Sequence, residues 1–178
     1  MSTVLNGIGY QLVWFAAVLG AARGLVAWGL AAAALFGVLH LATSARRSED
    51  ARLALLAAVL GSVLDGGLSL SGLVEYRATA SPWPPAWLLA IWAAFGLTVN
   101  HSFAWSQRHL AATAAVGALG GPLAYLAAAR LGAISVLTPT AYGVMALAVA
   151  WSVALPLLAA VARSRRHLPC RRPGGMPA

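Results

Sequence analysis

The sequence predicts an all-α integral membrane protein, a bundle of about six transmembrane helices with both termini in the cytoplasm. Apolar residues make up 61% of its 178 positions and charged residues only 9%, whereas soluble domains average about 45–50% and about 25%. Almost every stretch of about 20 residues is apolar enough to cross a bilayer, which leaves no room for a separate soluble domain. We therefore expect one membrane domain over residues 1–162, followed by a disordered, Arg-rich cytoplasmic tail over residues 163–178.

Six apolar runs, each bounded by charged residues, Pro or Gly, define the predicted helices. Their lengths of about 17–24 residues suit a hydrocarbon core of about 30 Å at a rise of about 1.5 Å per residue. In chain order, the predicted spans cover residues 4–20, 24–42, 53–74, 86–105, 110–128 and 139–162. The first span is the shortest and could be partly re-entrant. Thr138, before Pro139, predicts where the last helix begins.

The positions of the arginines predict the orientation. The chain has twelve basic residues, and all of them are Arg. Arg and Lys are enriched in the cytoplasmic loops of membrane proteins. With both termini inside, all but three of the arginines lie on the cytoplasmic side, and the exceptions are Arg23, Arg77 and Arg130. The absence of Lys and the abundance of Ala, Leu, Gly and Arg are typical of GC-rich bacterial genomes, so we expect the bacterial inner membrane.

Several classes of function do not fit this pattern. The net charge of +8 reflects topology signals, since it is not accompanied by a motif typical of nucleic-acid binding. Cys170 is the only cysteine and no Cys/His metal spacing occurs, so we expect neither a disulfide nor a metal. We expect no cofactor either, with a haem between His40 and His101 as a minor alternative. The start of the chain lacks the basic region of a cleaved signal peptide.

Asp65 is the most informative single residue, because it lies inside the third apolar run. A carboxylate at the centre of a transmembrane helix costs roughly 2.5–3.5 kcal/mol, so such a residue normally faces the interior of a bundle. Arg23 and Arg130, in the predicted outer turns, could reach it. We expect a structural ion pair or a hydrogen-bonded Asp65. The alternative is a carboxylate that relays protons or binds a substrate or an ion.

A candidate interior polar cluster is built around Asp65 in this interpretation. The fourth run carries the densest polar set, which includes Asn100 and His101. Polar residues of the other runs and of their outer ends could join it, since polar groups in membrane helices seek partners inside the bundle. The predicted cluster comprises Asp65, Asn100, His101, Gln11, Arg23, Tyr125 and Arg130.

Small residues in the apolar runs predict close helix packing. Such residues allow two backbones to approach closely in a membrane. The glycines concerned are Gly117 and Gly121, in a GxxxG pattern, and Gly61 and Gly72, near Asp65. A helix that breaks at Gly120-Gly121-Pro122, with its freed backbone groups lining a cavity, is the alternative.

Several polar and aromatic motifs are distributed along the chain. They are Asn6, Gln11–Phe15, Asp65, Trp87, Trp92, Thr98–Trp105 and Gly120–Tyr125. In this combination they resemble an uncharacterised family of small, proteobacterial, polytopic inner-membrane proteins, a domain of unknown function. The resemblance covers residues 6–156. Because similar proteins tend to be encoded near genes for fatty-acid cyclopropanation and related lipid modification, it implies a role in altering membrane lipids. It assigns no catalytic residue.

Three functional hypotheses follow. The first is an accessory or enzyme component of membrane-lipid or fatty-acid modification, in which Asp65 or His101 does acid–base or binding work. The second is a small proton-coupled transporter or permease in which Asp65 exchanges a proton. The third is a structural or assembly partner in a membrane complex. The lipid bilayer is the expected partner in each, with a membrane-protein partner or a second copy of the chain as options and no nucleic acid.

Overall fold

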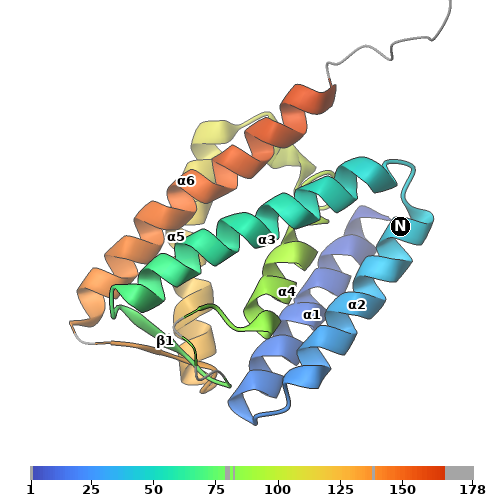
Figure 1. The fold of residues 1–178 in the computed structure, drawn as a ribbon. Helices are drawn as coiled ribbons and strands as arrows, with labels where there is room; N and C mark the ends of the chain where they lie inside the picture. The colour runs from blue at the N-terminus through green and yellow to red at the C-terminus, as the bar shows by residue number, and fades with distance from the viewer. Residues whose placement is uncertain (1, 79–80, 82, 138, 167–178) are drawn as a thin grey trace, which may run out of the picture.

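A computed structural model describes residues 2–78, 81, 83–137 and 139–166 and shows a helical bundle (Figure 1). Its helices are α1 (Thr3–Ala22), α2 (Val26–Thr43), α3 (Arg47–Leu70), α4 (Ala86–Gly96), α5 (Leu110–Arg130) and α6 (Thr140–Arg166). All but α4 are long and apolar enough to cross a membrane. Large apolar side chains cover the outer surface, and Val38, Leu119 and Val149 are each 65% or more exposed. So apolar a surface belongs in lipid, and the chain is a multi-pass helical membrane protein.

The long helices pair along the chain, and α4 lies among them (Figure 1). α1 packs on α2, α5 packs on α6, and α3 packs on α4. α4 also contacts α1 and α2, and its Trp87, Trp92 and Phe95 are buried. The start of α1, the α2–α3 turn and the end of α6 lie at one end of the bundle.

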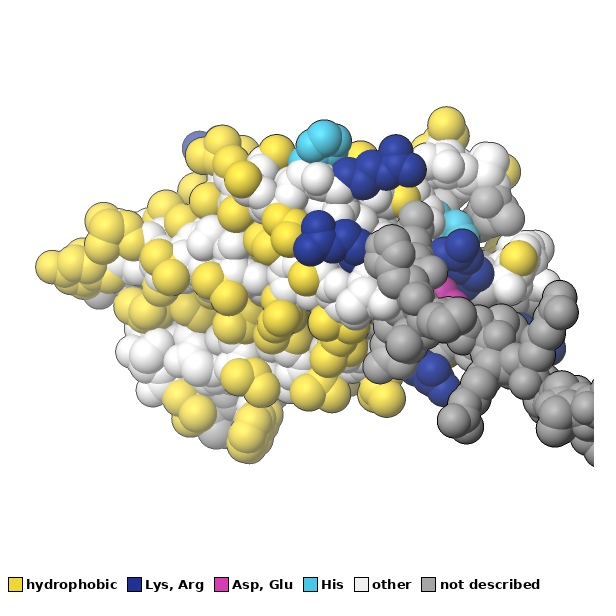
Figure 2. Space-filling view, turned by 90° about the horizontal axis from the view of Figure 1, so that it is seen from above, with side chains coloured by type: hydrophobic (Ala, Val, Ile, Leu, Met, Phe, Trp, Pro, Cys, Tyr) yellow, Lys and Arg dark blue, Asp and Glu magenta, His cyan; other side chains and the backbone are white. Residues whose placement is uncertain are grey.

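We call this end the Arg-rich end. Its described arginines include Arg46, Arg47, Arg52, Arg108 and Arg163. Figure 2, seen from above, shows Arg and His side chains gathered over part of this end and hydrophobic side chains over the surface beside them. The three arginines predicted to lie outside are at the opposite end of the bundle. Arg23 follows α1, Arg77 follows β1, and Arg130 is the last residue of α5.

The fourth helix is shorter than the predicted span of residues 86–105. It ends at Gly96. A Cβ atom on Gly96 would lie 2.5 Å from the Leu53 carbonyl oxygen of α3, so glycine permits an approach that no other residue allows. The Thr98 hydroxyl then donates to a carbonyl oxygen in the last turn of α4 (2.7 Å).

Residues 97–103 form successive turns, which lead into the 3₁₀ helix η1 (Ala104–Gln107). Backbone that is not helical is tolerated at membrane depth where protein covers it, and Leu97, Thr98 and Val99 are buried. The turns carry Asn100 and His101, which were predicted to lie on a regular helix. The early end of α4 therefore decides where these two side chains point.

A two-stranded antiparallel sheet, which we did not predict, closes the opposite end of the bundle. β1 (Val74–Tyr76) pairs with β2 (Ile134–Val136), and Tyr76 lies opposite Ile134. Each strand follows a helix that ends at a glycine with positive φ, Gly72 (67°) after α3 and Gly132 (86°) after α5; glycine adopts this conformation without strain. Gly72, predicted to pack against a helix, thus lies in a turn, and among the described residues no heavy atom beyond its chain neighbours lies within 4 Å of its Cβ position.

Two helix ends differ from the predicted spans. α3 begins at Arg47 rather than at residue 53 and carries Glu49 and Asp50 in its first turn, where the helix dipole favours acidic residues. α6 continues to Arg166 through Pro156, so it includes the first residues of the predicted tail, and basic residues are favoured at this end of a helix. Thr138, the predicted cap, and residues 167–178 of the predicted tail lie outside the described residues.

Candidate functional site

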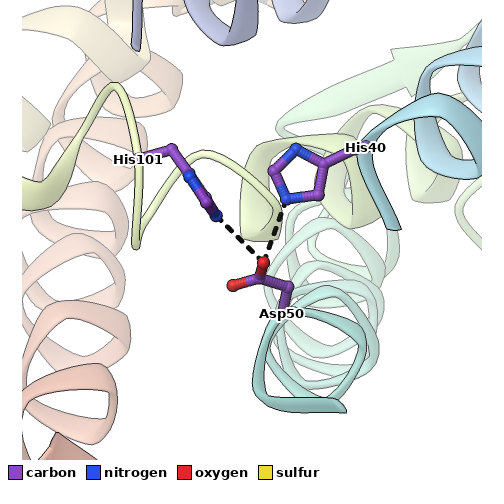
Figure 3. A group of neighbouring side chains, drawn as sticks. All are labelled: His40, Asp50 and His101. Carbon is purple, nitrogen blue, oxygen red and sulfur yellow. Dashed lines mark hydrogen bonds and ion pairs between the residues drawn. The ribbon is translucent and has the colours of Figure 1, made fainter. Parts of the chain in front are cut away.

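Asp50, in the first turn of α3, contacts four polar side chains. Its Oδ2 lies 3.1 Å from His40 Nε2, 2.9 Å from His101 Nε2 and 2.6 Å from the Ser44 hydroxyl. Its Oδ1 accepts a hydrogen bond from Asn100 Nδ2 (2.9 Å). Both imidazole rings point at the carboxylate, and they meet edge to face with centroids 4.5 Å apart (Figure 3). We call His40, Asp50 and His101 the Asp50 cluster.

Three segments bring the Asp50 cluster together at the Arg-rich end. His40 lies in the last turn of α2, and Asp50 lies in the first turn of α3. His101 comes from the turns beyond α4. The carboxylate sits near the positive, amino-terminal end of α3, which favours its negative charge. The Asp50 side chain is fully buried, whereas that of His101 is 20% exposed.

Asn6, buried in the first turn of α1, holds the His40 ring from its other side. Its Oδ1 accepts hydrogen bonds from the backbone N–H (3.2 Å) and hydroxyl (2.6 Å) of Ser102. Its Nδ2 lies 3.3 Å from the Leu97 carbonyl oxygen and 3.1 Å from His40 Nδ1. A backbone N–H can only donate and a carbonyl can only accept, so Ser102 and Leu97 together fix the orientation of the amide. Nδ2 therefore donates to His40 Nδ1.

This orientation defines the protonation of His40. A ring nitrogen that accepts a hydrogen bond carries no proton, so the proton of the neutral ring is on the other nitrogen. His40 Nε2 is thus the protonated nitrogen and donates to Asp50 Oδ2. A further proton on Nδ1 would face the amide hydrogens of Asn6, so the imidazolium form does not fit.

His101 is the one member of the Asp50 cluster whose side chain is partly exposed. Its Nε2 contacts Asp50, and among the residues that the structure describes its Nδ1 has no hydrogen-bond partner. Histidine exchanges protons readily near neutral pH. Partial exposure and a free ring nitrogen make His101 the ring through which the cluster can pass a proton to a substrate or to water.

Two imidazoles and a carboxylate are also a common ligand set for divalent metals, and the potential ligand atoms of the Asp50 cluster lie within 4.8 Å of one another. A histidine that binds a metal through Nε2 leaves that nitrogen unprotonated, and its Nδ1–H donates to a carboxylate or carbonyl. Asn6 instead offers His40 Nδ1 a donor. The cluster is therefore better suited to sharing protons than to binding a metal.

The same contacts bear on a haem between His40 and His101. Axial ligation by two histidines requires the iron to lie between their Nε2 atoms. Both Nε2 atoms are hydrogen-bonded to the same oxygen of Asp50, and the two rings are in direct contact. This geometry does not favour a haem at that place.

Replacing Asn6 with Leu is expected to destabilise the protein by about 1–3 kcal/mol, because buried groups of His40, Leu97 and Ser102 lose their partner. Thermal unfolding in maltoside micelles, followed by circular dichroism, measures the change. Gln11→Leu on the same helix is the control, since the Gln11 side chain is exposed, and it should change stability by less than about 0.5 kcal/mol. Equal effects of the two substitutions would mean that Asn6 does not hold the cluster.

Asp65 forms a second buried centre, toward the opposite end of α3. Trp92 Nε1 donates to its Oδ2 (2.7 Å), and the Tyr76 hydroxyl lies 2.9 Å from its Oδ1. The Tyr125 hydroxyl is also hydrogen-bonded to Oδ1. Asp65 lies 15 positions after Asp50, which is about 22 Å along a helix. The two carboxylates therefore occupy opposite ends of the bundle.

The predicted polar cluster is thus divided between two places. Of the residues assigned to it, Tyr125 contacts Asp65. Asn100 and His101 contact Asp50 instead, because the turns after α4 carry them to the Arg-rich end. Asp65 and the Asn100-His101 pair do not form one site.

The remaining predicted members of the cluster, Arg23, Arg130 and Gln11, are exposed. Long Arg side chains at helix ends can keep their charge at the headgroups while their stems cover apolar surface. Within the part of the chain that the structure describes, no salt bridge joins an Arg to Asp65. Asp65 is held by hydrogen bonds from aromatic side chains rather than by an ion pair.

Three of the predicted packing glycines lie at close helix contacts. A Cβ atom on Gly61 would lie 2.3 Å from the Trp92 ring of α4. Gly117 and Gly121 both face Trp151 of α6, again with atoms 2.3 Å from the Cβ position. α5 continues through Pro122 without a break. These glycines therefore bring helices together, and the alternative of a helix broken at this point is not what the structure shows.

Asp50, the centre of the first site, and most partners of Asp65 were not predicted from the sequence. Asp50 lies at the start of a helix, where acidic residues are common for electrostatic reasons, so nothing in its local sequence singles it out. Tyr76 and Trp92 are aromatic residues of a kind expected near headgroups or in cores. The one signal that could have found them is the presence of polar-tipped aromatic residues at the depth of Asp65.

The fold and these two centres define the class of protein, a multi-pass helical membrane protein with a buried carboxylate near each end of its bundle. Residues 3–157 match the family described as "Protein of unknown function (DUF2878)". The match covers nearly the whole chain, so the chain belongs to this family, which confirms the resemblance to a domain of unknown function. No curated protein and no solved structure matches the chain significantly.

Proposed function

We propose that the protein is an accessory or enzyme component of membrane-lipid modification, and that its Asp50 cluster supplies acid–base catalysis. The observation that carries this proposal is the geometry of His101. Asp50 holds one nitrogen of a partly exposed imidazole, and the other nitrogen has no hydrogen-bond partner among the described residues. A carboxylate that orients an imidazole in this way is a common arrangement in general acid–base catalysis. His40, kept neutral by Asn6, positions the carboxylate.

A groove beside the cluster suits an amphiphilic substrate. It has an empty volume of about 780 Å³ and is lined by α3, α6 and Asn100. Glu49 and Arg52 form its polar part, and its apolar part consists of Leu53, Leu55, Leu56, Val59, Val161 and Ala162. Arg52 offers a partner for an anionic headgroup, and the apolar wall offers a place for an acyl chain. Asn100 lines the groove and donates to Asp50, so it connects the two.

The distribution of arginines supports a location for the site. The Arg-rich end carries both the groove and the Asp50 cluster. Basic residues are retained on the cytoplasmic side of membrane proteins. We therefore place this chemistry at the cytoplasmic face of a bacterial inner membrane, where a lipid of the inner leaflet would reach it.

In a strain that lacks the gene, the lipid profile is expected to lose a modified species and to accumulate its precursor. Complementation with His101→Gln or Asp50→Asn should not restore the profile, because loss of a general acid–base residue slows a reaction by about 10²–10⁴-fold. Lipid mass spectrometry measures the ratio of the two species. His109→Gln, which changes an exposed histidine outside the cluster, should restore it. A wild-type profile in the His101→Gln strain, with the protein present in the membrane, would refute the proposal.

A small proton-coupled transporter is the second candidate, and the two buried carboxylates at opposite ends of α3 favour it. Ionisable residues in membrane helices often mark proton pathways. Reconstituted vesicles with an internal pH-sensitive dye distinguish the candidates. Solute-dependent proton flux that Asp65→Asn abolishes would support transport, whereas its absence, together with an altered lipid profile, would support the enzyme.

A further inference from the structure

A second cavity adjoins Asp65 and is walled by aromatic rings. Its empty volume is about 480 Å³, which includes open space at its mouth. The rings that form most of its wall are those of Tyr10, Trp14, Trp87, Trp92, Tyr125 and Trp151. Aromatic faces carry negative electrostatic potential and attract cations, and boxes of such rings recognise substituted ammonium groups. The wall itself therefore favours an organic cation over an anion.

The buried carboxylate strengthens this preference. Tyr76, Trp92 and Tyr125 each hydrogen-bond to Asp65, and each also lines the cavity. Asp65 thus lies directly behind one wall. In the described part of the chain no Arg forms a salt bridge with it. A cation in the cavity would give Asp65 a positively charged neighbour. The attraction between the two would be strong, because the dielectric constant inside the protein is low.

The cavity has neighbouring grooves on the side of the bundle. Two further grooves share Tyr10 and Ala124 with it, and their walls include residues of both α1 and α5. One of them has an empty volume of about 960 Å³ and is lined by Gln11 and Arg130 among others. The other runs past the small residues Gly117 and Gly120 toward the Arg-rich end. Large exposed apolar side chains on both helices, such as Leu12 and Leu123, place these grooves at the lipid surface.

The geometry points to a binding site for a lipid with a substituted ammonium headgroup, which enters from the bilayer between α1 and α5. The ammonium group would occupy the aromatic cavity in front of Asp65. The phosphate would lie at Arg130, since guanidinium groups pair well with phosphate, and an acyl chain would follow the groove past Gly117 and Gly120. Asp65 lies five residues before the end of α3 at Leu70, about 7.5 Å by the helical rise, a depth suited to a headgroup.

This site is separate from the proposed acid–base site, since Asp65 and Asp50 lie about 22 Å apart along α3. The two proposals therefore fail independently. A normal lipid profile in the His101→Gln strain would leave the ammonium site standing, and a lack of ammonium binding would leave the Asp50 cluster standing.

Binding of single-chain probes to the full-length protein in maltoside micelles tests the site, with tryptophan fluorescence as the readout. The probes are dodecylphosphocholine, dodecyltrimethylammonium and dodecyl phosphate. We expect the first two to bind at least about tenfold more tightly than the third, given the strength of desolvated cation–π contacts. Tetramethylammonium, which has no chain, should bind at least about tenfold more weakly than dodecyltrimethylammonium, since buried methylene groups add affinity. Equal affinity for dodecyl phosphate, or for tetramethylammonium, would overturn the proposal.

Variants locate the probes within the protein. Trp14→Leu should weaken the binding of both ammonium probes by about tenfold, and it leaves the hydrogen bonds of Asp65 intact. Arg130→Gln should weaken dodecylphosphocholine but not dodecyltrimethylammonium, because only the former carries a phosphate. Trp28→Leu, which removes a Trp that is 51% exposed on α2, should leave all affinities unchanged. Unaltered binding to the Trp14→Leu variant would contradict the assignment, whether or not Asp65 variants fold.

Discussion

Replacing Asp50 with Ala is expected to lower the free energy of unfolding by about 3–5 kcal/mol, the cost typical of removing one partner from a buried charged network. The substitution leaves side-chain donors of two segments, the end of α2 and the turns after α4, without their acceptor. These donors belong to His40, Ser44, Asn100 and His101. Each buried donor without a partner costs about 1–3 kcal/mol, and the end of α2 and the turns after α4 lose their common anchor. Thermal unfolding in maltoside micelles measures the loss.

Glu49, the adjacent acidic residue, provides the control for Asp50. Its salt bridge is a 4.0 Å contact with the exposed Arg46, and pairs of this kind contribute about 0–1 kcal/mol. Glu49→Gln is therefore expected to leave the unfolding temperature nearly unchanged, although it removes the same charge from the same turn of α3. If Asp50→Ala were as mild as Glu49→Gln, Asp50 would not be the residue that joins the three segments.

Gly117→Ala is expected to destabilise the protein by about 1–3 kcal/mol, the range for over-packing a close contact. The new methyl group would lie 2.3 Å from the Trp151 carbonyl oxygen. That oxygen belongs to the backbone of α6 and cannot rotate away, so α5 and α6 must separate. Fluorescence-detected size-exclusion chromatography after heating measures the stability of the variant against that of the natural chain.

Gly120→Ala is the matched substitution in the same helix. At Gly120, no heavy atom of the described residues outside the surrounding turns of α5 lies within 4 Å of the Cβ position, and Ala is favoured over Gly inside a helix by about 1 kcal/mol. We expect this variant to be as stable as the natural chain or slightly more stable. Equal losses at both positions would mean that the flexibility of glycine, rather than the contact with α6, is what α5 requires.

The helices could be predicted from hydropathy because lipid imposes its own length on apolar segments. The bundle, its five long helices and its class follow from that constraint alone. α4 is the exception, since it ends at Gly96, where it lies against the backbone of α3. A contact between residues more than 40 positions apart leaves no local signal. The same holds for the β1–β2 sheet, whose two strands are three residues long and lie far apart in the chain.

The candidate site could be predicted in its residue types but not in its grouping. Asn100 and His101 stood out as polar residues in an apolar run, yet their partner is Asp50 and not Asp65. The predicted spans placed Asp65 but not Asp50 inside a helix, whereas α3 begins at Arg47 and carries both acids. Asn6 contacts His40 and Ser102 across 34 and 96 positions of sequence, so its role in fixing the His40 tautomer becomes visible only in three dimensions.

The tautomer of His40 is the property on which the proposed site depends most. Nitrogen-15 NMR of protein labelled in its histidine rings measures it directly, because the shift of each ring nitrogen reports whether that nitrogen carries a proton, a free electron pair or a metal. The chain has four histidines, and the His40→Gln variant assigns the signals of His40 by their loss. At neutral pH we predict a His40 ring that is protonated at Nε2 and unprotonated at Nδ1. A ring protonated at Nδ1, or one with Nε2 bound to a metal, would contradict the proton-sharing cluster.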